Sequence, residues 1–144
     1  MNAVLFSCYV GTNDASAELG LEAWINNIKF FDSKHIDQPQ IVSVDLSDNE
    51  GNHELRFVMT GKTAEHTKID EQGNIVKDAT LQLSDITING IDINQLFQEQ
   101  SVYTHDFNGT QPEIQSKFYG IAGCNGTISF RFTTPIYLWL LENM

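Results

Sequence analysis

Carboxylate and amide side chains gather in one polar segment, residues 61–78, which lies between two apolar runs of the sequence. Calcium in proteins takes about six to eight oxygen ligands from carboxylates, amides and carbonyls, and a flexible acidic loop with a glycine for a sharp turn can supply them. The spacing here differs from that of an EF-hand. One hypothesis is therefore a calcium-holding loop. Its candidate metal ligands are Glu65, Asp70, Glu71, Asn74 and Asp78.

The same segment also fits a plain β-hairpin, in which the charged side chains along the two arms are solvated. Gln72, Gly73 and Asn74 would form its tip, because glycine and asparagine favour tight turns. The acidic residues would then bind no metal. The sequence leaves both interpretations of residues 61–78 open.

Motifs that mark common enzyme classes are absent from the sequence, which has no GxSxG, HExxH or phosphate-binding loop. Its four histidines are scattered, and His53 falls on the apolar side of an alternating run, where packing explains it. Glu65 and Asp78 could form a carboxylate pair in space, but the sequence does not supply the distance that catalysis would need. We therefore expect a binding protein and no enzyme.

The charge balance narrows the range of partners. Eight Lys and Arg against nineteen Asp and Glu give a formal net charge of −11 at pH 7, a field that repels nucleic acid and attracts cations. The charge therefore permits calcium without demonstrating it. Apolar stretches fall far short of the roughly 20 residues of a spanning helix, so we expect no membrane insertion.

The two cysteines, Cys8 and Cys124, lack the spacing of a zinc site, which leaves two free thiols or a disulfide as alternatives. The first ten residues lack the basic start of a signal peptide, and no small-residue cleavage site follows. We therefore expect a protein that is made in the cytoplasm and leaves it only as part of an assembly.

Short runs of β-branched and aromatic residues, separated by turn residues, must position these side chains. Residues 48–52 are expected to be a hairpin turn between two strands, and a parity change near Ser84 and Asp85 predicts a β-bulge. We expect an all-β chain: one antiparallel β-sandwich domain of jelly-roll type over residues 1–144. The expected strands are residues 2–10, 19–26, 41–47, 53–59, 81–88, 101–107, 113–120 and 128–132, with a short helical turn at 93–99.

Residues 55–62, Leu-Arg-Phe-Val-Met-Thr-Gly-Lys, lead into the acidic segment, which is followed by Asp-Ala-Thr-Leu-Gln-Leu-Ser-Asp-Ile-Thr-Ile-Asn-Gly at residues 78–90. This arrangement, over residues 18–92, resembles the calcium-dependent xylan-binding carbohydrate-binding modules. Thr80 and Ser84 stand where that family has Asn and Asp. The positions that match the family are Asp78, Leu81, Leu83, Ile86, Ile88 and Gly90.

The resemblance implies a β-sandwich whose loop-bound calcium coordinates sugar hydroxyls, with Glu22 as a second carboxylate beside Asp78. Trp24 has the same strand parity as Glu22, so its ring could stack on a sugar; packing against the sheet is the alternative. His66 and Tyr103 are further candidates for ligand binding. The implied cofactor is Ca²⁺ and the implied partner is a glycan.

Residues 105–110, 117–120 and 132–139 give the whole chain a resemblance to small virion proteins of marine tailed phages that carry this type of module. The resemblance implies a non-catalytic, calcium-dependent carbohydrate-binding module that acts as a surface or adhesion protein of a phage virion. The alternative is a structural capsid or tail decoration protein without a sugar ligand.

Six consecutive apolar residues follow Pro135, and an alternating strand would bury only half of them. An exposed apolar edge favours association, so we expect this terminus to contact a second copy or another virion protein. The alternative is a closing strand that is buried within the monomer. The expected interface residues are Ile136, Tyr137, Leu138, Trp139 and Leu140.

Overall fold

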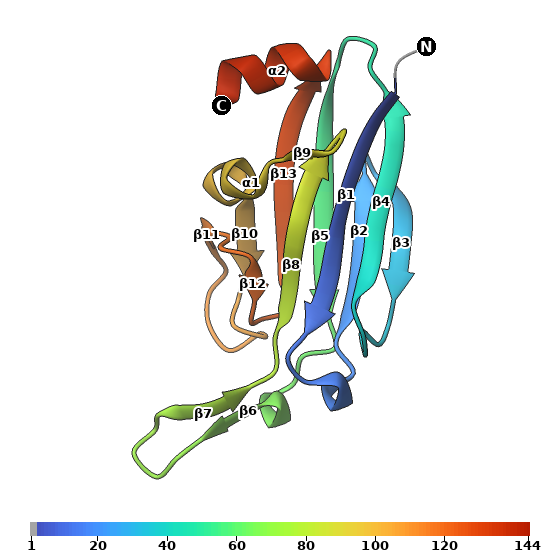
Figure 1. Cartoon of the computed structure of the whole chain (residues 1–144). Helices are drawn as coiled ribbons and strands as arrows, with labels where there is room; N and C mark the ends of the chain where they lie inside the picture. The colour runs from blue at the N-terminus through green and yellow to red at the C-terminus, as the bar shows by residue number, and fades with distance from the viewer. Residues whose placement is uncertain (1–2) are drawn as a thin grey trace.

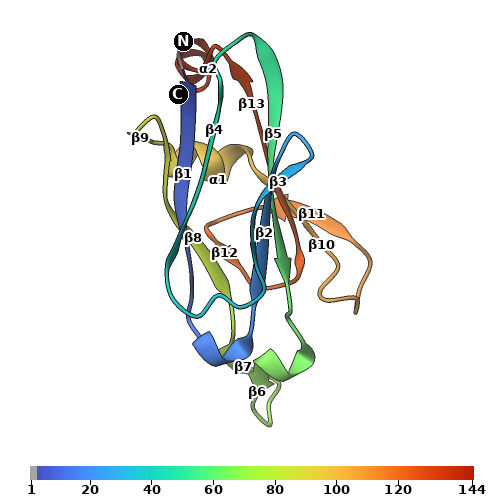
Figure 2. The ribbon, with the colours of Figure 1, turned by 90° about the vertical axis from the view of Figure 1, so that its right-hand side faces the viewer.

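Two antiparallel sheets face each other in the computed structural model, which describes residues 3–144 (Figures 1 and 2). The first sheet has the order β12 (Ile121–Ala122), β8 (Leu81–Ile88), β1 (Ala3–Thr12) and β4 (Gln40–Ser47), and β9 (Ile91–Asp92) pairs with β8. The second has the order β11 (Ile114–Lys117), β10 (Val102–His105), β13 (Gly126–Thr134), β5 (Gly51–Thr60), β2 (Gly20–Ile25) and β3 (Ile28–Ser33).

Aromatic side chains join the two sheets in the core. Phe6 of β1 and Phe57 of β5 come from opposite sheets, and their ring centroids are 5.9 Å apart. Helix α1 (Asn94–Gln100) adds Phe97, whose ring lies 6.4 Å from Phe6 and 4.8 Å from Phe130. Burial of each such side chain stabilises the fold by about 1.5–3 kcal/mol. The predicted antiparallel β-sandwich is confirmed.

The expected bulge and the short helix are also present. Pairing of β1 with β8 shifts between Ser7 opposite Thr87 and Tyr9 opposite Ser84, and Asp85 has a φ of 50°. The helical turn expected at residues 93–99 is α1. The first expected strand is β1, although residue 2, where it was expected to begin, lies outside the described residues.

The predicted hairpin at residues 48–52 is wrong. Strand β4 pairs with β1 in the first sheet, whereas β5 pairs with β2 and β13 in the second, so this turn connects the two sheets. Alternation shows that a strand has one buried face but does not identify its neighbour. The expected strands also omitted β3, whose residues are partly exposed or exposed.

The C-terminal residues form helix α2 (Ile136–Asn143), which corrects the predicted strand. Ile136, Trp139 and Leu140 are buried in the chain's own core at a helical spacing, so they are not available to a partner. Trp139 lies 5.7 Å from Phe130 between ring centroids. Of the expected interface, Tyr137 and Leu138 are exposed. Within residues 3–144, the structure shows no helix that is both long and apolar enough to span a bilayer.

A hairpin projects from the end of the sandwich opposite α2 (Figure 1). It consists of β6 (Thr67–Ile69) and β7 (Ile75–Asp78), which form a separate two-stranded sheet. The 3-10 helix η2 (Ala64–His66) precedes it, and a second one, η1 (Ala15–Ala17), lies at the same end. Residues 67–78 of the acidic segment therefore form the expected β-hairpin.

Candidate functional site

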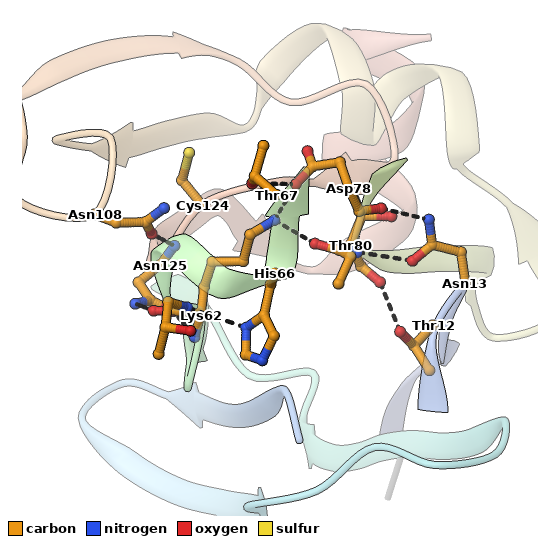
Figure 3. A network of polar contacts seen from close by, with 12 residues as sticks. Thr12, Asn13, Lys62, His66, Thr67, Asp78, Thr80, Asn108, Cys124 and Asn125 are labelled. Carbon is orange, nitrogen blue, oxygen red and sulfur yellow. Dashed lines mark hydrogen bonds and ion pairs between the residues drawn. The ribbon is translucent and has the colours of Figure 1, made fainter. Parts of the chain in front are cut away.

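The carboxylate of Asp78, at the end of β7, is held by a lysine and a threonine at the base of the hairpin (Figure 3). Lys62 Nζ donates a hydrogen bond to Asp78 Oδ1 at 2.5 Å, and Thr67 Oγ1 donates to the same oxygen at 2.7 Å. The ammonium also donates to the carbonyl oxygen of Ala79. The expected metal ligand is therefore half of an ion pair.

Lys62 is fixed through its backbone as well as through its ammonium. Its N–H donates to Asn125 Oδ1 at 2.8 Å, and Asn125 Nδ2 donates to its carbonyl at 2.9 Å. The side chain of Lys62 is 0% exposed. Sequence reasoning missed this residue, because a lone lysine after a strand has the pattern of a solvated charge. Its burial depends on a partner that lies 16 residues further along the chain.

A second set of contacts connects the start of β8 to the end of β1. Asn13 Nδ2 donates to the carbonyl of Asp78 at 2.8 Å, and Thr80 N donates to Asn13 Oδ1 at 2.8 Å. Thr12 Oγ1 donates to the carbonyl of Thr80 at 2.8 Å. Together with the ion pair, these bonds fix the base of the hairpin against the sandwich.

The remaining acidic residues of the segment lie apart from Asp78. Asp70 Oδ1 accepts hydrogen bonds from the backbone N–H groups of Asn74 and Gln72, each at 2.9 Å, and these bonds lower the pKa of Asp70. Glu71 is exposed at the hairpin tip, and Glu65 is exposed on η2. Asp70 and Asn74 therefore stabilise a tight turn.

Glu22 and Trp24 lie on the outer face of the second sheet. Trp24 Nε1 donates to Glu22 Oε1 at 3.1 Å. Lys29 of β3 and Arg56 of β5 each place a cationic group 5.5 Å from the centroid of the Trp24 ring. These two cations come from the strands on either side of β2, so the ring is already in contact with charged side chains. This packing on the sheet is one of the two alternatives for Trp24, and a role in sugar binding stays a prediction.

The expected ligands do not fit a calcium ion. Within residues 3–144, no group of three or more His, Cys, Asp and Glu side chains is placed to hold a metal. Asp78 faces the ammonium of Lys62, while Glu22 faces Trp24. Calcium needs several oxygen ligands around one point, whereas Asp78 lies at the base of the hairpin and Asp70, Glu71 and Asn74 lie at its tip.

A cleft of about 800 Å³ lies between the hairpin and η1. Glu65 and His66 line it, and Asp14 faces Lys77 across it with 3.4 Å between Oδ2 and Nζ. Hydrogen bonds from Ser16 lower the pKa of Asp14. This cleft brings together two of the predicted residues with two that sequence reasoning missed. Its other lining residues are Ser16, Ala17, Thr67, Lys68 and Ile69.

A second groove, of about 430 Å³, lies on the outer face of the second sheet. Glu54 Oε2 accepts from Ser129 Oγ at 2.7 Å and from Arg131 Nε at 3.3 Å. The hydrogen bond from Ser129, followed by the contact with Arg131, holds the pKa of Glu54 below its usual range. The other lining residues are Arg56, Gln100, Val102, Thr104, Gln115 and Thr127.

Tyr103 is buried, which corrects its predicted role in ligand binding. Its hydroxyl donates to the carbonyl of Cys124 and accepts from the N–H of Cys124 at 3.0 Å, and burial raises the pKa of Tyr103 to about 12. Both cysteines are free thiols. Burial raises the pKa of Cys8 to about 12 and also raises that of Cys124.

Comparison with solved structures shows a similar fold in a calcium-dependent carbohydrate-binding module, vCBM60. The TM-score is 0.52 at 15% identity, over 88% of this chain and 89% of that chain. A structure of vCBM60 in complex with galactobiose gives a TM-score of 0.47 at 16% identity, over 90% of this chain and 97% of that chain. No protein-family model and no curated protein matches the sequence. The similarity confirms the fold that the sequence resemblance implies.

Proposed function

We propose that this chain is a non-catalytic carbohydrate-binding module. The observation that carries the proposal is the shared fold with the carbohydrate-binding module vCBM60, which extends over 88% of this chain. A fold can host several functions, so the surface must also suit a sugar. The cleft between the hairpin and η1 provides polar side chains of both charges on an open surface.

Sugar hydroxyls can both donate and accept hydrogen bonds, and this cleft offers partners for both. Glu65 and Asp14 present carboxylate oxygens, and Lys77 presents an ammonium. His66 Nδ1 accepts from the backbone N–H of Thr63 at 3.1 Å, which orients its ring at the cleft wall. In a hydrated polar site, sugar hydroxyls replace water molecules with little net gain in binding free energy, so the proposed binding is weak.

The sequence resemblance also implies that binding depends on calcium, and vCBM60 is described as calcium-dependent. In this chain the predicted ligands are separated and Asp78 is paired with Lys62. We therefore assign the proposed binding to the protein's own side chains and derive no step through a metal.

Binding to a glycan array, with xylan and galactan oligosaccharides included, tests the proposal. Glu65→Gln removes a carboxylate from the cleft and should reduce binding several-fold without changing the melting temperature. His66→Ala should also reduce binding several-fold, with a somewhat lower melting temperature because the Thr63 N–H loses its acceptor. Gln115→Ala, in the groove of the outer sheet, is the matched control and should bind as the unaltered protein does. Loss of binding in the control alone would move the site to the second groove, and no binding to any glycan would refute the function.

The proposed location of this module is the surface of a phage virion, where it would act in adhesion. Its support is the sequence resemblance to small virion proteins of marine tailed phages. Immunogold labelling of purified virions tests the location, and antibody that blocks adsorption to host cells tests adhesion. Label found only in the lysate would contradict it.

A decoration role without a sugar ligand is the second candidate, favoured by exposed apolar residues at the helical end. Leu138, Leu141 and Met144 are 56%, 81% and 70% exposed. Such a surface favours contact with a second copy or with another virion protein. Light scattering of the unaltered protein and of Leu141→Glu tests this role, because an assembly that uses this surface would dissociate in the variant.

A further inference from the structure

The ammonium of Lys62 is a cation that the chain itself supplies at the base of the hairpin. Lys62 is 4% exposed and is the only charged residue that is buried among residues 3–144. A charge is removed from water at a large cost unless close partners compensate for it. The oxygens of Asp78, which Figure 3 shows facing Lys62, and of Ala79 provide that compensation.

The oxygens around this ammonium are of the types that bind metal cations. They comprise Asp78 Oδ1 and the backbone carbonyl oxygen of Ala79, and the hydroxyl of Thr67 donates a further hydrogen bond to Asp78 Oδ1. Calcium takes carboxylate and carbonyl oxygens at about 2.3–2.6 Å. The ammonium already contacts both of these oxygens, so an ion and the ammonium could not share the position.

Lys62 joins three segments that are distant in the sequence, through its ammonium to Asp78 and Ala79 and through its backbone to Asn125. Lys62 follows β5, Asp78 and Ala79 precede β8, and Asn125 precedes β13. Thr67 and Asp78 are also opposite each other where the hairpin begins. A cation at this point therefore joins the hairpin to both sheets, which is the structural task of a metal in a loop.

We propose that the Lys62 ammonium replaces a bound calcium ion as the cation of this loop. Neither the fold nor the carbohydrate binding then requires calcium; the statement about binding rests on the proposed function. One ammonium balances the single carboxylate of Asp78. Entry of calcium would displace Lys62 and leave its charge buried without a partner, so the two cations exclude each other.

The melting temperature of the unaltered protein in millimolar calcium chloride and in EDTA is the first measurement. A ligand that binds only the folded state raises the melting temperature, so we expect the two values to agree. A rise of several degrees in calcium would overturn the proposal. This measurement involves no sugar. Absence of glycan binding would therefore refute the proposed function but would leave the proposal about Lys62 and the fold unaffected.

Reversal of the charge provides the second measurement. Lys62→Glu places two carboxylates around the vacated position, so we expect a low melting temperature in EDTA and a rise in calcium that sodium chloride at equal ionic strength does not reproduce. Lys62→Met is the matched control, similar in length and without charge, and should lose stability with no response to calcium. A folded Lys62→Glu protein that ignores calcium would refute the claim that the position suits a cation.

If the Lys62→Glu protein does not fold, a third comparison, between Lys62→Met and the double variant Lys62→Met with Asp78→Asn, tests the proposal. Lys62→Met should melt well below the unaltered protein, because the Asp78 carboxylate loses its partner. Asp78→Asn added to Lys62→Met should recover part of the loss, since no charge then remains unpaired. A Lys62→Met protein as stable as the unaltered one would overturn the proposal.

Discussion

The two ends of the sandwich are closed by different kinds of interaction. At the hairpin end, an ion pair and hydrogen bonds join Lys62, Thr67 and Asp78. At the other end, helix α2 covers the core with Ile136, Trp139 and Leu140. Figure 1 shows the hairpin and α2 at opposite ends of the long axis.

The difference shows how a sequence pattern that suggests an external partner can be satisfied within the chain. The apolar run after Pro135 suggests contact with another protein, yet a helical spacing buries half of it in the core, where Trp139 packs against Phe130 and Phe132. The acidic segment suggests a metal, yet the carboxylate of Asp78 at its base is paired with Lys62. The hairpin end depends on balanced charges, and the helical end depends on side chains that fill the core. We therefore expect substitutions that remove a charge to destabilise the first end and substitutions that leave a cavity to destabilise the second.

The largest expected effect is at the helical end. Trp139→Ala removes a buried ring that contacts Phe130 and Phe132, and loss of such a side chain costs about 3–5 kcal/mol because a cavity remains. Urea denaturation measures the free energy of unfolding. The control is Leu138→Ala on the same helix, where 56% exposure predicts a change within about 0.5 kcal/mol. Equal losses would show that α2 does not close the core.

The next effect is at the hairpin end. Asp78→Ala leaves the buried Lys62 ammonium without its carboxylate, and breaking a buried pair costs about 3 kcal/mol or less here, since the Asp78 side chain is 31% exposed. Calcium should not change the loss. Asp70→Ala at the hairpin tip is the matched control, and its expected effect in the same urea titration is below about 1 kcal/mol. A comparable loss in the control would mean that the tip and the base act as one unit.

The smallest effect concerns pH. His53 Nδ1 accepts from Asn26 Nδ2 at 2.8 Å, and Asn26 Oδ1 accepts from Glu54 N at 2.9 Å, so the amide orientation favours a neutral ring. Its Nε2 donates to Thr134 Oγ1 at 2.9 Å. Burial lowers the pKa of His53, which means that the unfolded chain binds a proton at a higher pH than the folded chain does.

The contribution of His53 is therefore fully present above about pH 6.5, the ordinary value for histidine, and is lost as pH falls from there through the lowered pKa. We expect the melting temperature to fall across that window in the unaltered protein and less steeply in His53→Gln. Calorimetry at a series of pH values measures the two slopes. Parallel slopes would contradict a neutral, partly buried His53.

Much of the fold could be predicted from local patterns. Alternation in residues 53–59 and 128–132 gives β5 and β13, because a strand buried on one face repeats every two residues. The parity change beside Asp85 likewise gives the bulge in β8. Strand partners could not be predicted. The hairpin expected between β4 and β5 is wrong because alternation carries no information about the neighbouring strand.

The candidate site was less accessible to sequence reasoning. Glu65 and His66 were found because they are polar and close in sequence, and both line the cleft beside η1. Lys62 was not found, since its burial arises from contacts with Asp78 and Asn125 that only the tertiary structure creates. Trp24 was expected at a ligand, but the cations that pack on it come from neighbouring strands.

The projecting hairpin has a consequence for protein engineering. Its turn is closed by its own bonds, from Asp70 N to the carbonyl of Asn74 and from Gly73 N to the carbonyl of Asp70, and Ile75 and Val76 are exposed. Insertions are tolerated best at exposed loop tips whose backbone makes few hydrogen bonds with the rest of the fold. A peptide epitope or a fluorophore tag inserted after Gly73 would therefore be displayed clear of both sheets, with the ion pair at Asp78 as the anchor.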